Sequence, residues 1–339
     1  MSQESILFIY TSFTQFVKTD FEILSSVYKV KESRFKPVHG LINTALEMTR
    51  QFFFLLFNVH RFDAVYIWFA DYHSFLPVLF AKVFGKKSYV VIGGYEVGRV
   101  RDLHYGALCS KFRGFFCIRS MRMSSLNLTV SSYVDRKMKY IAPGAKRKLV
   151  YNCVDFDPVP DQAIEKEKLV LTVGIIENER SFKLKGIDTF IEVARITPEY
   201  SFVIVGLDKQ QLPGLIASLP ANIHIYGKVA HNELASYYRK AKYYCQLSRS
   251  ESFGVSIAEA MFYKCIPIVT NEGGMPELAG ASGFIVKRDV SLISSLIKNE
   301  PAETRGMQQE SANRIRVEYS RAKRKESITS LISHQTAKM

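Results

Sequence analysis

The chain has 339 residues, of which 47% are hydrophobic and 23% are charged. This composition excludes a disordered or collagen-like chain, and the length suits two domains of ordinary size, each able to bury a core. The formal net charge of +14 indicates an anionic partner.

Positive charge gathers in the first half of the sequence. Residues 1–150 carry 22 Lys and Arg against 10 Asp and Glu, a net of +12, whereas residues 151–339 carry 24 against 22, a net of +2. An anionic membrane surface, an acidic substrate and nucleic acid would each be attracted to such a half. Nucleic acid is disfavoured because the basic residues form no recognisable binding motif.

Cysteine usage and the apolar stretches indicate the compartment. The five cysteines are odd in number and show no CxxC or metal-like spacing, which predicts reduced thiols and no metal site. The N-terminal stretch lacks the basic region of a signal peptide. The most apolar stretch, QFFFLLFNV at 51–59, is too short to span a bilayer. We expect a cytoplasmic protein that is soluble or lies on a membrane surface without crossing it.

Short apolar runs in the first half predict buried strands. A helical pattern over 39–57 lies between the first two of them. Near-continuous runs of this kind are typical of parallel sheets that are covered on both faces. The runs are ILFIY (6–10), AVYIWF (64–69), SYVVIGG (88–94), LNLTVS (126–131) and KLVYNCV (148–154).

A second series of strands and helices follows a polar linker. The linker, DFDPVPDQAIEKEK at 155–168, carries two prolines and many charges. Two such series predict an α/β fold with two doubly wound domains and a cleft between them, where ligands sit at strand carboxyl ends. The predicted strands are 169–176, 201–206, 222–227, 243–248, 266–270 and 283–286, and the predicted helices are 186–197, 231–241, 253–264 and about 301–332.

The stretch SESFGVSIAEAM, 250–261, is the first candidate site. Its loop enters a helix near Phe253, Gly254, Val255 and Ser256, where free amides and the helix dipole suit a diphosphate, and the glycine permits close approach. Two glutamates flank this turn eight positions apart. Since a carboxylate repels phosphate, Glu251 and Glu259 are expected to accept hydrogen bonds from sugar and ribose hydroxyls. The alternative is a helix cap and a solvated glutamate.

Two further loops are expected at the same strand ends. In VGIIENERSFKLKG, 173–186, the strand ends at Gly174, and Lys185 and Arg180 are suited to bind phosphate oxygens. Solvated loop charges are the alternative. In TNEGGMPELAG, 270–280, a glycine pair and a proline predict a tight loop approaching the cleft.

Together these motifs resemble one family. ESFGVSIAEAM, the upstream Arg180-x4-Lys185-Gly186, the GGMPEL loop and the YNCVD strand end at 151–155 occur in the order found in retaining glycosyltransferases of family 4, or group 1, which have the GT-B fold. The resemblance covers about residues 125–290. It implies two Rossmann-like domains, 1–155 on the acceptor side and 156–320 for the nucleotide sugar, with a helix in 321–339 crossing back to the first.

The resemblance also implies roles. Lys185 and Arg180 would neutralise the donor diphosphate without a metal or other cofactor, Glu251 would contact the donor sugar, and Glu259 would hold the ribose. The backbone of Lys228 and Val229 would meet the base. The sequence departs from the family pattern in three places: Ile175 replaces a frequent arginine, Lys264 replaces a helix-ending glycine, and the loop 11–24 lacks a glycine pair.

The first half contributes expected acceptor residues. A strand ends at Gly93 and Gly94, followed by Tyr95 and Glu96, and Glu96 is interpreted either as a weak base toward the acceptor hydroxyl or as a surface glutamate. His104 is ten residues after Gly94 and is equally consistent with a surface histidine. Some relatives share an FVKxD pattern, which places Lys18 and Asp20 near the acceptor.

Basic and aromatic residues alternate over 99–123, as in segments that bind anionic membranes. The apolar helix expected in 39–61, with Arg50 and Arg61 towards its far end, suits the same surface; an ordinary core helix with solvated charges is the alternative. Together with this charge pattern, the resemblance implies an enzyme that moves a sugar from a nucleoside-diphosphate sugar to a glycan or lipid-linked acceptor of surface polysaccharide synthesis, at the inner face of the membrane. A transferase with a soluble acceptor and a non-catalytic binding subunit are the alternatives.

Overall fold

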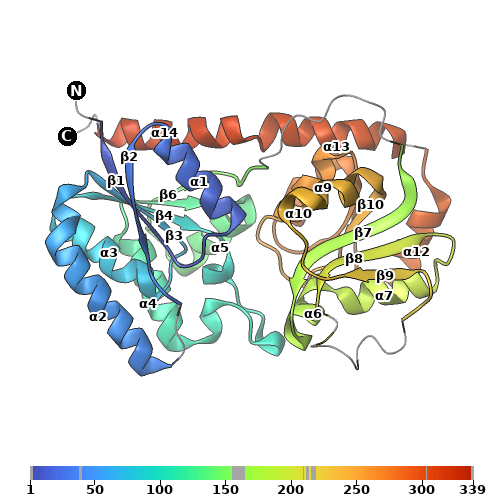
Figure 1. The fold of residues 1–339 in the computed structure, drawn as a ribbon, viewed down its shortest axis with the longest axis horizontal. Helices are drawn as coiled ribbons and strands as arrows, with labels where there is room; N and C mark the ends of the chain where they lie inside the picture. Colours follow the sequence, from blue (N-terminus) through green and yellow to red (C-terminus); the bar gives the residue numbers. More distant parts are fainter. Residues whose placement is uncertain are drawn as a thin grey trace. The chain divides into compact units, whose positions relative to one another are not determined.

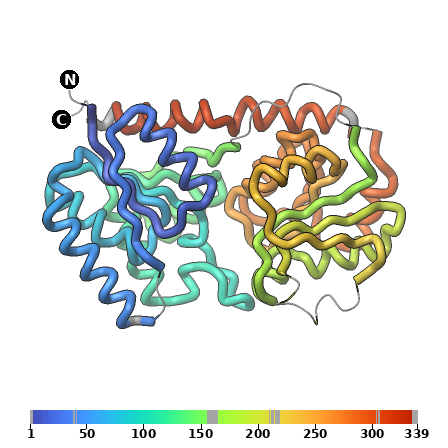
Figure 2. The backbone as a smooth tube through the Cα atoms, in the orientation of Figure 1, coloured from blue at the N-terminus to red at the C-terminus, as the bar shows by residue number. Residues whose placement is uncertain are grey.

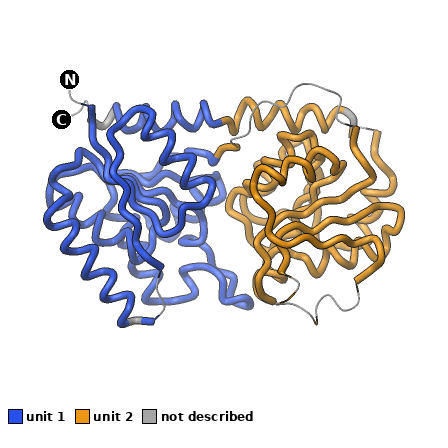
Figure 3. Tube along the Cα trace, viewed as in Figure 1, with its two compact units in different colours: residues 1–152, 321–339 blue, residues 153–320 orange. Residues whose placement is uncertain are grey.

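The computed structural model describes residues 3–37, 40–154, 165–208, 210, 214, 219–302 and 304–336. Its internal contacts divide the chain into two compact units (Figure 3). Unit 1 comprises residues 1–152 and 321–339, and unit 2 comprises residues 153–320. Each unit is built on a six-stranded sheet whose neighbouring strands all pair in parallel, as the apolar runs predict.

The sheet of unit 1 has the strand order β2-β1-β3-β4-β5-β6. Its central strands are buried because their residues are apolar on both faces; Phe8, for example, pairs with Tyr66 in the β1–β3 register, and the two rings stack. The strands are β1 (Ser5–Tyr10), β2 (Lys29–Arg34), β3 (Ala64–Trp68), β4 (Lys87–Ile92), β5 (Leu126–Thr129) and β6 (Arg147–Leu149).

Six α-helices belong to the described part of unit 1. The last of them, α14, arrives from the far end of the chain and lies beside α1 (Figure 1). Figure 2 follows the backbone from blue to red along this return. The helices are α1 (Gln15–Ser25), α2 (Leu41–Asn58), α3 (Tyr72–Val83), α4 (Lys111–Met123), α5 (Ser132–Ile141) and α14 (Arg321–Thr336).

A buried ion pair fixes α14 in unit 1. The Arg324 guanidinium donates to both carboxylate oxygens of Asp20, at 2.6 and 2.7 Å, and to the carbonyls of Val150 and Tyr151. The Tyr66 hydroxyl donates to the same carboxylate at 2.7 Å. Because each charge meets several partners, the desolvated pair is satisfied.

Unit 2 has the strand order β12-β11-β10-β7-β8-β9, and its core includes Phe190, Phe202, Tyr243 and Ile268. The strands are β7 (Glu167–Ile176), β8 (Ser201–Leu207), β9 (Ile223–Tyr226), β10 (Ala241–Gln246), β11 (Ile266–Thr270) and β12 (Phe284–Val286). The helices are α6 (Glu179–Lys185), α7 (Ile187–Arg195), α9 (His231–Lys240), α10 (Val255–Phe262), α11 (Met275–Ala279), α12 (Val290–Asn299) and α13 (Thr304–Glu318).

Several predicted boundaries were wrong. The predicted helix 301–332 is two helices, α13 and α14, and β2 was not predicted because its sequence, KVKESR, is polar. The run 148–154 forms β6 only to Leu149, although Val154 makes an isolated bridge to Ser320. Residues 155–164 of the predicted linker lie outside the described residues, and the linker's end already belongs to β7.

Lys264 takes the place where the family pattern has a helix-ending glycine. Its φ of 63° lies in the left-handed region, and the Cys265 amide donates back to the Ala260 carbonyl at 3.0 Å. This is the helix-ending geometry that a glycine usually serves, so the lysine bears backbone strain. In the described part of the chain, no helix has the length and apolar character needed to cross a membrane.

Candidate active site

Lys185 is held in place by the helix that ends at it. The polar loop predicted after Gly174 is shorter than expected, because β7 continues to Ile176 and α6 begins three residues later. Asn178 and Ser181 form a capping box at the start of α6. At its end, Gly186 has φ 69°, and a Cβ there would lie 2.0 Å from the Leu247 carbonyl oxygen. Only glycine fits, so the direction of the chain at Lys185 is fixed.

Lys185 and Glu251 form an ion pair at the carboxyl ends of β7 and β10. The Lys185 Nζ lies 2.7 Å from Glu251 Oε2, and the two side chains remain 26% and 20% exposed. The lysine chain runs past Gly174, where a Cβ would stand 3.7 Å from it. A cation and a carboxylate that are neighbours and still reach solvent can be separated by an anionic ligand with hydroxyl groups.

The glycine pair of the GGMPEL loop packs against the backbone of Glu251. The Gly274 amide donates to the Glu251 carbonyl at 2.9 Å. A Cβ on Gly273, whose φ is 69°, would lie 1.7 Å from that carbonyl oxygen. Gly273 is therefore required for the close packing of these two loops, whereas Gly274 contributes its backbone amide.

The start of α10 offers backbone donors beside Glu251. Gly254, with φ 94°, precedes the helix, and its carbonyl accepts from the Ile257 and Ala258 amides. The amides of Val255 and Ser256 stand in the first turn, where a helix supplies no acceptor of its own. Phe253 contributes backbone alone, because its ring is buried against Tyr319.

Glu259 lies about one turn into α10 and is buried. Its carboxylate is 2.8 Å from His231 Nε2 and accepts a hydrogen bond of 2.8 Å from the Tyr238 hydroxyl. Burial holds the pKa of Tyr238 well above its usual value, so this phenol stays a donor. The sequence analysis missed both partners, although their spacing of seven places them on one face of α9.

A cavity of about 720 Å³ opens at the ends of β7, β8 and β9. Lys228, predicted to meet the base, lines it, and Val229 follows directly. Gly206 shapes the floor, because a Cβ there would lie 2.0 Å from the Gly174 carbonyl oxygen. The lining residues are Ile175, Glu177, Gly206, Leu207, Asp208, Gln210, Ile225, Tyr226, Gly227 and Lys228.

Arg180 is not brought to the Lys185–Glu251 pair. It lies in the first turn of α6 and is exposed, whereas Lys185 ends that helix. Within the described ranges, its guanidinium makes no hydrogen bond or ion pair.

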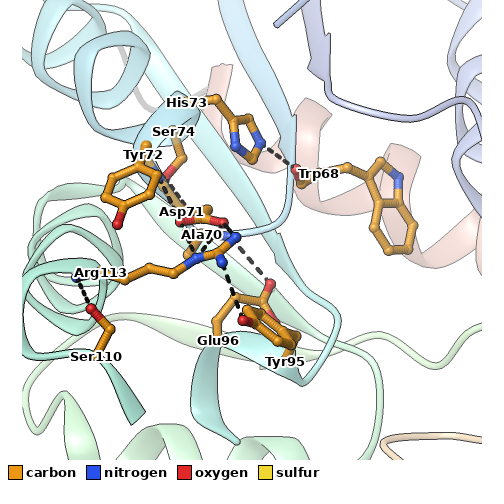
Figure 4. A network of polar contacts seen from close by, with 10 residues as sticks. All are labelled: Trp68, Ala70, Asp71, Tyr72, His73, Ser74, Tyr95, Glu96, Ser110 and Arg113. Atoms are coloured by element: carbon orange, nitrogen blue, oxygen red, sulfur yellow. Dashed lines mark hydrogen bonds and ion pairs between the residues drawn. The ribbon is translucent and has the colours of Figure 1, made fainter. Parts of the chain in front are cut away.

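In unit 1, Glu96 is a buried residue and not a surface glutamate. Its carboxylate accepts from the amides of Ala70, Gly93 and Gly94 at 3.2, 3.1 and 2.7 Å, and it is 1% exposed (Figure 4). Burial raises the pKa of Glu96 to about 7, although the three amides favour the charged form. Glu96 thus joins the ends of β3 and β4.

Beside Glu96, an aromatic and charged cluster surrounds Arg113. Its guanidinium pairs with both oxygens of Asp71, donates to the Tyr95 hydroxyl at 3.1 Å, and lies over the rings of Tyr72 and Tyr95 (Figure 4). These groups line a cavity of about 520 Å³. Its lining residues are Thr11, Phe35, Pro37, Thr44, Phe69, Asp71, Tyr72, His73, Tyr95, Glu96 and Arg113.

Phe69 lines this cavity, and Gly93 packs against its ring. Phe69 has φ 69°, which is unusual for a bulky residue, and a Cβ on Gly93 would lie 2.2 Å from its ring. Such strain at a strand end is typical of binding sites.

The other expected acceptor residues lie elsewhere in unit 1. Asp20 is fully buried and paired with Arg324, so its carboxylate is not presented to solvent; its place near the acceptor stays a prediction. Lys18 is exposed on α1 and lies 3.7 Å from Glu22. His104 is exposed in a left-handed turn with φ 46°. None of the three lines the 520 Å³ cavity.

Comparison with known proteins is informative for unit 2 and for the fold. Residues 156–314 match the family model described as glycosyl transferases group 1. No curated protein sequence matches the chain. The solved structure of sucrose-phosphate synthase from Thermosynechococcus elongatus matches with a TM-score of 0.83 at 14% identity, over 99% of this chain and 100% of that one.

Two further structures share the fold at equally low identity. Alr3699/HepE from Anabaena, in complex with UDP and glucose, has a TM-score of 0.72 at 14% identity, over 98% of this chain and 100% of that one. The lipopolysaccharide outer core galactosyltransferase WaaB has 0.68 at 14%, over 98% and 99%. The predicted GT-B fold and enzyme class are confirmed: residues 156–314 match the group 1 glycosyltransferase model, and the chain shares its fold with these solved structures.

Proposed function

We propose that the chain transfers a sugar from a nucleoside-diphosphate sugar to a hydroxyl acceptor with retention of anomeric configuration, as the resemblance to family 4 implies. The Lys185–Glu251 ion pair, beside the free amides of α10, carries this proposal. Solved complexes of Alr3699/HepE with UDP-glucose support a nucleotide-sugar donor.

In the proposed reaction, the donor diphosphate lies between Lys185 and the start of α10. The leaving diphosphate gains negative charge as its bond to the sugar breaks, and an ammonium and helix amides that are already in place stabilise that charge. Glu251, released from the lysine, accepts hydrogen bonds from the donor sugar. The proposal uses no metal or other cofactor, and Arg180 remains a candidate second cation that would approach the diphosphate from α6.

Glu259 and the 720 Å³ cavity are proposed to hold the nucleoside. A buried carboxylate that already meets His231 and Tyr238 is fixed in orientation, and its remaining lone pairs suit the two ribose hydroxyls. The base would enter the cavity beside Lys228, where backbone groups at the ends of β8 and β9 face it.

The acceptor is proposed to bind in the 520 Å³ cavity of unit 1. Faces of Tyr72 and Tyr95 suit a sugar ring, and Asp71 and Arg113 supply an acceptor and donors for its hydroxyls. Glu96, Gly93 and Gly94 hold the cavity wall. We further propose that the acceptor is a lipid-linked glycan, reached at an anionic membrane on the inner face, because unit 1 is strongly basic.

The first experiment is binding and slow hydrolysis of UDP-, GDP-, ADP- and CMP-sugars by the purified protein. One donor should be hydrolysed, and Lys185→Ala and Glu251→Gln should each lower its hydrolysis by about 10²–10³-fold. Lys183→Ala is the matched control, since this neighbour on α6 is exposed and pairs with Glu179. Hydrolysis by Lys185→Ala at the wild-type rate would sink the proposal.

A further inference from the structure

Helix α2 carries large apolar side chains on its solvent-exposed face. Ile42, Leu46, Phe53 and Phe57 are 78%, 63%, 53% and 62% exposed, although large apolar side chains normally face the core. Their spacing of four, seven and four residues places them along one face of the helix. We call this set the α2 stripe; the neighbouring Phe52 and Leu56 are exposed as well.

The orientation of α2 is fixed by polar contacts on its buried face. Glu47 accepts from the Lys36 amide at 2.9 Å and pairs with Arg50, and the Gln51 side chain donates to the His73 carbonyl at 2.9 Å. Rotating the helix to bury its phenylalanines would strand these polar groups. The stripe is therefore presented outward by the fold.

The surroundings of the stripe are basic. Glu47 is the only acidic residue of α2, and it is neutralised by Arg50; helices α3 and α4 contain none. Rings join the three helices, Phe52 to Phe80 and Phe75 to Phe116. The exposed cations of this region are Arg50, Arg61, Lys82, Lys111, Arg119 and Arg122, and its further exposed apolar residues are Val83, Phe84, Phe112 and Phe115.

We infer that the α2 stripe docks unit 1 on an anionic lipid bilayer, with Phe53 and Phe57 entering the boundary between headgroups and acyl chains. Apolar rings among exposed cations suit that boundary, where the rings leave water and the cations meet lipid phosphates. A second copy of the chain is disfavoured as occupant, because it would bring a basic face against a basic face.

This inference deepens the proposed function and rests on its membrane partner. Thr44 lines the 520 Å³ cavity, and Ile42 and Leu46 lie within two residues of it on the same helix. Residues two apart point to opposite sides of a helix, so α2 contributes to the cavity proposed for the acceptor sugar from one face and presents the stripe on the other.

The test is sedimentation with vesicles, without any donor. Wild-type protein should bind phosphatidylcholine vesicles that contain phosphatidylglycerol, and bind neutral vesicles far more weakly. The double variant Phe53→Ser/Phe57→Ser should bind the anionic vesicles about tenfold or more weakly. Val317→Ser/Leu292→Ser, which removes two exposed apolar side chains of unit 2, should bind like the wild type. Circular dichroism checks folding, and Phe57→Ser alone replaces a double variant that fails to fold.

The outcomes distinguish a failure of the proposed membrane partner from a failure of the α2 stripe as its docking surface. If the wild type does not bind anionic vesicles, the proposed membrane partner is wrong. The hydrolysis assay still tests the transfer reaction independently. If it binds them and the stripe variant binds equally well, the stripe inference is overturned while the membrane partner stands. If the wild type is a dimer that the stripe variant makes monomeric, and vesicles bind neither, the stripe is a subunit interface and the inference is overturned.

Discussion

At the scale of residues, the candidate sites combine side chains that the sequence predicts with side chains that it does not. Glu251 and Glu259 follow from the sequence because one local motif contains both. Lys185 follows from a separate motif 66 residues earlier, and only the family resemblance links the two motifs. Asp71, Arg113 and His231 do not, because each acts through a partner that the chain supplies far away; Arg113, for example, meets Asp71 across 42 residues. The spacing of residues along the sequence does not predict a contact between residues that only the fold brings together.

The buried Glu96 makes the unfolding free energy of the protein depend on pH. Burial raises its pKa from 4.5 to about 7, so the folded chain holds this proton more tightly than the unfolded chain. Its contribution to stability is complete below about pH 4.5 and is lost as the pH rises through 7. We expect the unfolding free energy of the wild type to fall by about 3 kcal/mol relative to Glu96→Gln between about pH 5 and 8.

Urea unfolding at several pH values measures this difference. The exposed Glu310→Gln is the control and should track the wild type at every pH. A wild type that keeps a constant stability difference from Glu96→Gln across this range would contradict the assigned burial.

At the scale of elements, strongly apolar strands were predictable and polar ones were not. Strand β2 lies at a sheet edge, where KVKESR exposes its charged residues and lacks the apolar run that marks a strand. The break between α13 and α14 was missed because both helices are polar and no Gly or Pro separates them. For α2 the sequence left two interpretations open, a helix at a membrane surface and an ordinary core helix, because an apolar run does not show which face is buried.

The buried pair between α1 and α14 should be costly to break. Arg324→Ala leaves the Asp20 carboxylate without its cation in a buried site, so we expect a loss of about 3–5 kcal/mol in unfolding free energy. Lys18→Ala breaks the exposed pair with Glu22 on the same helix and should cost less than about 1 kcal/mol. Denaturant unfolding of both variants measures the contrast; equal costs would show that the buried pair carries no special weight.

At the scale of the whole molecule, two sheets were predictable from their runs of apolar segments, apart from the polar edge strand β2. The crossing back of the last helix to the first domain was expected only from the family resemblance. The 16 residues of α14 complete unit 1 although they come after all of unit 2 in the sequence.

Deletion of residues 321–339 should therefore damage the two units unequally. It removes Arg324 from the Asp20 carboxylate and uncovers α1, so unit 1 should lose protection against proteolysis. Unit 2 keeps all its own contacts, and its donor binding should survive. Limited proteolysis with mass spectrometry, read beside donor binding, measures both; a truncated chain whose residues 1–152 resist cleavage like the wild type contradicts this role of α14.

The position of α14 late in the sequence also affects the order in which the two units can fold during translation. Asp20 leaves the ribosome early, and Arg324 is made 304 residues later, which at roughly 5–20 residues per second takes about 15–60 s. The first sheet is thus translated long before the cation that neutralises its buried carboxylate exists. Unit 2 can fold as a continuous segment before α14 is available, and the final maturation of the N-terminal half therefore comes after the synthesis of all of unit 2.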